Sequence, residues 1–192
     1  MPKVSTAPVP MVPPALEAEL VIEDDRWSAT PEVEAAVNAA IAALCATRPR
    51  GLPAASTATI VLACDSVVAA LNARFRGKQT ATNVLSFPAG PGATAPGAAP
   101  YLGDVIIAHE TVAREAADSG ITLVHHVQHL TIHGVLHLLG YDHSLDRDAA
   151  VMEALETRIL ALLGVADPYQ HSATPRGIDA AQIPLAPPHR RP

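Results

Sequence analysis

The sequence is poor in cysteine and in charged residues, and each shortage excludes a class of protein. Cysteine occurs twice in 192 residues, too rarely for a disulfide framework, and Cys45 and Cys64 are not spaced as a metal-binding pair. Charged residues make up 17% of the chain against 49% hydrophobic residues, which excludes a wholly disordered protein. No apolar run approaches the roughly 18 residues of a membrane-spanning helix. We therefore expect a globular protein with no membrane partner.

Basic residues are also scarce, because 13 Lys and Arg stand against 19 Asp and Glu, giving a net charge of −6. This balance argues against a protein that coats nucleic acid through a uniformly basic surface, but it leaves room for a local basic patch. The N-terminus lacks the continuous apolar stretch of a secretory signal, since four prolines interrupt it between residues 8 and 14. We expect a cytoplasmic protein.

The prolines that are present mark out the domain organisation. Five of the 18 lie in residues 2–14 and six in residues 168–192, where no periodic apolar pattern is found. The length suits one domain of about 150 residues. We predict a folded domain over residues 16–169, a disordered N-terminal extension over residues 1–15, and a disordered proline-rich tail over residues 170–192.

Apolar periodicity within the domain predicts strands that first alternate with helices, followed by a helical C-terminal half. Thr30 and Pro31 are typical of an N-cap and first helical turn, and Asp65 or Ser66 could cap the next helix. The predicted strands are 19–22, 58–63, 83–87 and 102–108; the predicted helices lie between Thr30 and Pro49 and at 65–74, 109–119, 122–139 and 146–163. This order predicts an α+β fold in which a mixed β-sheet is packed with helices.

Histidines are concentrated in one helix, where His129, His133 and His137 recur at every fourth residue. Residues at this spacing lie about 40° apart around a helix and about 6 Å apart along it, so the three form one stripe. Two imidazoles four residues apart can bind one metal ion from the same helix face. Gly140 permits a left-handed turn that would bring His143 back to the stripe.

The segment from His133 to His143 reads HGVLHLLGYDH, which has the ligand spacing of the metzincin motif HExxHxxGxxH. Gly134 occupies the place of the catalytic glutamate, so the base that takes a proton from water in those peptidases is missing. Only three protein ligands are evident, whereas a closed structural zinc site usually has four. We predict one Zn²⁺ per chain, bound by His133, His137 and His143 on a helix and the following turn, with an open position.

Residues beside this motif have more than one candidate role. His129 could orient a metal ligand from outside the coordination sphere, touch the substrate, or face solvent. Asp142 could orient an imidazole or move a proton, but an aspartate beside a turn also commonly caps it. We expect His125 and His126 to lie at the surface.

Several motifs together resemble the YbeY family of bacterial endoribonucleases, also called ribosomal RNA maturation factors. The histidine segment fits the family signature HGxLHLxGYDH, and further similar stretches read LNARFRGK at 71–78, TNVLSFP at 82–88, LGD at 102–104, MEALE at 152–156 and DPY at 167–169. The resemblance covers about 150 residues and implies a zincin-like α+β fold. It also implies metal-dependent cleavage of single-stranded RNA, in 3′-end maturation of small-subunit ribosomal RNA and in ribosome quality control.

The resemblance assigns the family's catalytic arginine to Arg76. A guanidinium suits that role because it stays charged and can bind phosphate oxygens through two donors. Arg74 and Lys78 would complete a local basic patch that binds a few RNA phosphates near the metal. The implied partners are single-stranded RNA, ribosomal RNA and the small ribosomal subunit, and we expect no DNA partner.

Three questions stay open at the level of sequence. The metal could activate water against the phosphodiester, or it could stabilise charge while a ribose 2′-hydroxyl attacks. The ligand spacing also suits a metallopeptidase, which Gly134 disfavours. A third possibility is a ribosome assembly module whose metal is structural.

Overall fold

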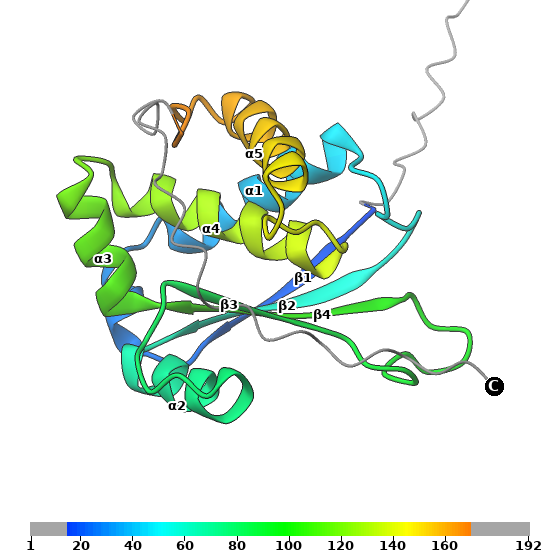
Figure 1. The fold of residues 1–192 in the computed structure, drawn as a ribbon, viewed down its shortest axis with the longest axis horizontal. Coiled ribbons are helices and arrows are strands. Elements are labelled where there is room, and N and C mark those ends of the chain that lie inside the picture. The colour runs from blue at the N-terminus through cyan, green and yellow to red at the C-terminus, as the bar shows by residue number, and fades with distance from the viewer. Residues whose placement is uncertain (1–14, 170–192) are drawn as a thin grey trace, which may run out of the picture.

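The computed structural model describes residues 15–169, in which helices cover a four-stranded sheet (Figure 1). The strands are β1 (Glu17–Ile22), β2 (Thr57–Ala63), β3 (Val84–Pro88) and β4 (Tyr101–Ala108). The helices are a short 3₁₀ helix η1 (Asp25–Ala29), then α1 (Val33–Thr47), α2 (Asp65–Arg76), α3 (His109–Asp118), α4 (Leu123–Leu138) and α5 (Asp146–Ala161). The predicted extensions, residues 1–15 and 170–192, lie outside the described residues except for Ala15.

The sheet is mixed, with strand order β1-β2-β4-β3. β1, β2 and β4 are parallel, whereas β3 pairs with β4 in the antiparallel direction, for example Leu85 with Ile106 and Ser86 with Val105. Parallel neighbours need long connections, and α1 and α2 lie within those connections. The predicted α+β class with a mixed sheet is confirmed, and β3 is an outer strand of the sheet.

Helix α4 lies between the sheet and the outer helix α5, while α2 lies on the opposite side of the sheet (Figure 1). The apolar side of α4 is fully or almost fully buried, including Val127, Leu130, Ile132, Val135 and Leu136. A smaller buried cluster, which includes Val68 of α2 and Leu85 of β3, fills the other side of the sheet. The main core therefore fixes the rotation of α4, and with it the direction in which its histidines point.

Two predicted helix caps are wrong. Thr30 does not cap α1, because its N–H donates to the Trp27 carbonyl and so completes η1, and α1 begins only at Val33. Asp65 is the first residue of α2 and caps nothing in that helix; its carboxylate instead accepts the N–H and hydroxyl of Thr111 at the start of α3. The hydrogen-bond partner of Thr30 therefore comes from η1, and that of Asp65 comes from α3. Within residues 15–169, no helix is long and apolar enough to cross a membrane.

Candidate metal centre

The turn after α4 brings the third histidine of the motif to the other two. Gly140 adopts φ +88°, a left-handed conformation that glycine tolerates, and the Tyr141 N–H donates to the Leu136 carbonyl at 3.0 Å. The chain then returns, so that the His143 ring centroid lies 5.5 Å from that of His133 and 5.0 Å from that of His137. The structure therefore has the turn that the sequence predicts.

The three imidazoles fit a metal ion in both position and chemistry. One nitrogen from each of His133, His137 and His143 lies within 4.8 Å of the others. Nδ1 of His137 donates to the Tyr141 carbonyl at 2.9 Å, and Nδ1 of His133 donates to Glu156 Oε1 at 2.8 Å. In the neutral rings both Nε2 atoms then carry lone pairs, and these atoms lie only 3.1 Å apart. Two facing lone pairs repel each other, and a shared cation removes that conflict.

Electrostatics around the group favour neutral imidazole and ionised carboxylate. Burial lowers the pKa of His137, and the neighbouring His133 and His143 lower it further, which favours the neutral form that binds metals. Burial raises the pKa of Glu156, but hydrogen bonds from His129 and His133 outweigh this effect and bring the pKa to about 2. Glu156 is therefore an anion that accepts hydrogen bonds from both histidines.

A cleft of about 640 Å³ contains the three histidines together with Arg76, Asn83, Ser86 and Asp142. Arg76 is the last residue of α2, is exposed and lines the cleft, and α2 lies on the side of the sheet opposite α4. Arg74 and Lys78 are exposed but do not line the cleft, and the Arg74 guanidinium lies 5.2 Å from the Phe75 ring centroid. The structure thus brings Arg76 to the histidines and leaves Arg74 and Lys78 outside.

Gly134 allows α4 to lie close against the sheet. A Cβ at this position would come within 2.4 Å of Val105 Cγ1 in β4 and within 3.2 Å of Ser86 Oγ in β3. Ser86 donates its hydroxyl hydrogen to the Gly134 carbonyl at 3.1 Å, which ties the helix to the outer strand. The position taken by the glutamate in the metzincin motif is therefore filled by the sheet, with no room for a catalytic carboxylate.

The remaining sequence candidates occupy three different environments. His129 Nε2 donates to Glu156 Oε2 at 3.1 Å, and its side chain is only 16% exposed. Asp142 caps its own turn, accepting the His143 N–H at 2.7 Å and the Ser144 hydroxyl at 2.6 Å. The predicted surface position of His126 is wrong, because this residue is buried and hydrogen-bonded to Glu115, an acceptor contributed by α3.

Glu156 and Ser86 are two residues at this site to which the sequence pattern gave no role. Glu156 comes from α5, and its side chain is completely buried among the apolar residues of that helix. A carboxylate on the core face of an amphipathic helix was a usable signal, because such a group needs buried donors. Ser86 carried no comparable signal, since a serine on an outer strand is ordinary.

The fold and the site define a mixed α+β domain in which one cleft holds an arginine and a three-histidine group able to bind a metal ion. A family model described as Endoribonuclease YbeY matches residues 22–164, and the chain belongs to this endoribonuclease family.

Curated relatives named Endoribonuclease YbeY support the same membership. The Maricaulis maris protein is 50% identical over 151 residues, covering 79% of this chain and 90% of the relative. A Rhodopseudomonas palustris protein is 51% identical over 160 residues, covering 82% and 91% respectively. The Jannaschia sp. protein is 47% identical over 163 residues, covering 80% and 100% respectively. The resemblance found in the sequence motifs is thereby confirmed.

Proposed function

We propose that this protein is a zinc-dependent endoribonuclease that cleaves single-stranded RNA. Its proposed role is 3′-end maturation of small-subunit ribosomal RNA and ribosome quality control, with the small ribosomal subunit as partner and the cytoplasm as location. Family membership supports RNA cleavage, and the observation that carries the proposal is the shared cleft of Arg76 and the three histidines. The proposed catalytic domain spans residues 16–169.

His133, His137 and His143 would hold one zinc ion, because one nitrogen of each ring lies within 4.8 Å of the other two. The Nδ1 hydrogen bonds of His133 and His137 leave Nε2 of both rings free for the metal. When bound, zinc supplies a Lewis acid that polarises a phosphoryl oxygen and makes water more acidic. Three imidazoles leave room for a further, exchangeable ligand. The donor set therefore suits catalysis better than a closed structural site.

Arg76 is the residue proposed to bind the reacting phosphate. Its guanidinium is permanently charged and offers paired N–H donors to the oxygens on which negative charge develops. Arg74 and Lys78 are proposed to bind flanking phosphates of the RNA strand, outside the cleft itself. The attacking group is either water or the ribose 2′-hydroxyl, and the chemistry of the product ends identifies which.

The peptidase alternative loses its support in this structure, because the sheet fills the space beside Gly134. The assembly-module alternative makes a different prediction from ours. A structural zinc would couple metal loss to unfolding, whereas an open catalytic centre would lose RNA cleavage and keep most of its fold.

Arginine substitutions test the proposed function. Arg76→Ala should lower the rate of cleavage of a defined single-stranded RNA by about 10²- to 10³-fold, with zinc content and folding unchanged. Arg76→Lys should restore only part of the rate, because an ammonium lacks the planar pair of donors. The matched control is Arg114→Ala on α3, an exposed arginine whose side chain contacts Thr111 and does not line the cleft. Equal losses in Arg76→Ala and Arg114→Ala would refute the specific role of Arg76.

A further inference from the structure

A buried carboxylate links three separate parts of the protein behind the histidine group. Glu156 of α5 is fully buried, and its two oxygens accept hydrogen bonds from His133, His129 and Tyr169. His133 and His129 lie on α4, and Tyr169 lies beyond the end of α5. Asp167 holds Tyr169 in place, because its carboxylate accepts both the Tyr169 N–H at 2.9 Å and the Thr157 hydroxyl at 3.0 Å.

The buried position of Glu156 needs an explanation, because removing a carboxylate from water is strongly unfavourable before its hydrogen bonds are formed. An apolar residue at position 156 would pack between α4 and α5 without that cost. Unlike an apolar residue, the carboxylate can accept the Nδ1 hydrogen of His133, at 2.8 Å. That hydrogen bond fixes which ring nitrogen carries the hydrogen and leaves Nε2 free on the side of His137 and His143.

We propose that Glu156 is a positioning residue for the metal centre: it orients His133 toward the metal, and it is itself held in place by His129 and Tyr169. This proposal rests on the proposed metal site of His133, His137 and His143. His129 is then neither a metal ligand nor a substrate contact. It donates to the second oxygen of Glu156, together with the Tyr169 hydroxyl, and both donors stop the carboxylate from rotating away from His133.

His129, His133 and Glu156 also lie close enough together to be considered as a second metal site. The hydrogen bonds argue against it. Nδ1 of His133 and Nε2 of His129 already donate to the carboxylate, and the Tyr169 hydroxyl takes a further lone pair, so the group is satisfied without a cation. A positioning role therefore predicts one zinc ion per chain, whereas a second site predicts two.

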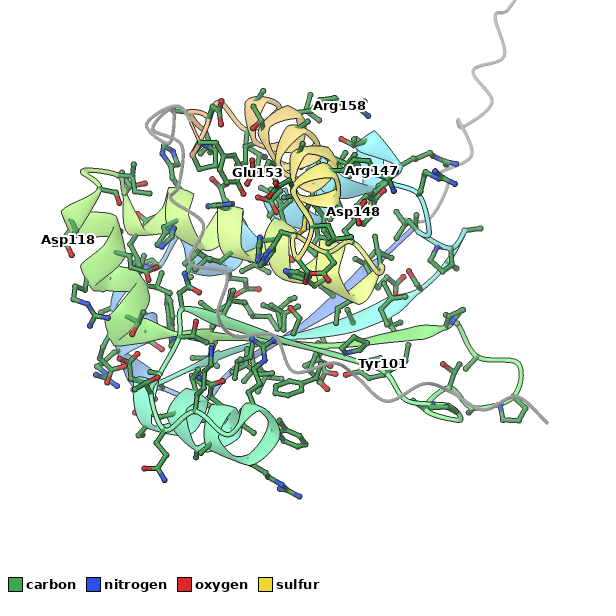
Figure 2. The ribbon with its side chains drawn as sticks, viewed as in Figure 1. Tyr101, Asp118, Arg147, Asp148, Glu153 and Arg158 are labelled. Carbon is green, nitrogen blue, oxygen red and sulfur yellow. The ribbon has the colours of Figure 1, made fainter. Side chains whose placement is uncertain are left out.

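The test compares the full-length wild type with three variants. Two quantities are measured for each protein: the affinity for zinc, by competition with a chromogenic chelator, and the number of zinc ions bound per chain. Glu156→Gln keeps the size of the side chain but replaces the anionic acceptor, and it should weaken zinc binding about 10- to 100-fold. Tyr169→Phe should weaken it by a smaller factor of about two to five, because it removes one of three donors to the carboxylate and keeps both histidine donors. Glu153→Gln is the matched control from the same helix (Figure 2), since it makes the same change of charge and no side-chain hydrogen bond of Glu153 is found within residues 15–169. It should bind zinc like the wild type.

Circular dichroism of each metal-free variant checks folding, and Tyr169→Phe decides the matter if Glu156→Gln does not fold. Zinc affinity within twofold of wild type in the folded Glu156→Gln protein, or unchanged affinity in Tyr169→Phe when Glu156→Gln is unfolded, would overturn the positioning role. Two zinc ions in the wild type, reduced to one in Glu156→Gln, would overturn it in favour of a second site. A wild-type protein that binds no zinc would instead contradict the proposed metal centre on which the inference depends.

Discussion

Replacing Gly134 with alanine tests how closely α4 approaches the sheet. In an ordinary helix the change stabilises a protein, because alanine exceeds glycine in helix propensity by about 1 kcal/mol. Here the new Cβ would lie 2.4 Å from Cγ1 and 3.0 Å from Cγ2 of Val105, and 3.2 Å from Ser86 Oγ. Val105 is fully buried and β-branched, so it cannot move aside by changing rotamer. Overpacking of this kind costs about 1–3 kcal/mol, and we expect a net loss of up to about 2 kcal/mol in the free energy of unfolding.

The sign of the effect should reverse when Val105 is made smaller. In a Val105→Ala background both Cγ atoms are gone, so Gly134→Ala should no longer overpack the interface and should stabilise the protein by up to about 1 kcal/mol. Urea denaturation of the four proteins in this cycle, at one free zinc concentration, measures both effects. Stabilisation by about 1 kcal/mol in both backgrounds would refute the close approach of α4 to β4, because helix propensity alone would then explain the result.

Three further changes probe the metal centre and its surroundings. His137→Ala should leave the zinc content well below one per chain, and full occupancy measured by metal analysis would remove His137 from the ligand set. Chelation of the wild-type zinc should abolish RNA cleavage while the far-UV circular dichroism stays near that of the loaded protein; unfolding on chelation would instead favour a structural metal. Burial lowers the pKa of His126 below its usual 6.5. The contribution of the neutral ring to stability is therefore complete above pH 6.5 and is lost as the pH falls through the lowered pKa, because the folded protein resists protonation of this ring. Metal-free His126→Gln should therefore lose less stability than the metal-free wild type over that pH range. The control is His125→Gln. If the free energy of unfolding fell equally steeply with pH in the wild type and both variants, this prediction would be contradicted.

The parts of the site that come from one continuous segment could be predicted from the sequence. His133, His137 and Gly140 have fixed relations within a helix and its C-terminal turn, because helical geometry and the conformational freedom of glycine are local properties. These two rules also suffice to bring His143 to the group. The sheet was similarly predictable where β-forming apolar runs are bounded by proline or aspartate, as at β2 and β3.

Features that depend on contacts between distant segments could not be predicted in this way. Glu156 and His133 are 23 residues apart along the chain, and Gly134 contacts Val105, which lies 29 residues earlier. No local sequence pattern indicates either contact. The wrong surface position of His126 has the same origin, because Glu115 of α3 covers this residue and only the tertiary arrangement determines that contact. The wrong cap at Thr30 has a local cause, since Thr30 ends the short helix η1.

The most direct test of the proposed RNA-cleaving zinc centre is a zinc titration of the metal-free protein during cleavage of a defined single-stranded RNA, with the product ends identified. Cleavage should rise with added zinc and stop rising at one zinc per chain, and each cut should leave either a 2′,3′-cyclic phosphate, from attack by the 2′-hydroxyl, or a 5′-phosphate, from attack by water. RNA cleavage that is equally fast in the metal-free protein, or no cleavage by a folded protein carrying one zinc per chain, would contradict the proposed function.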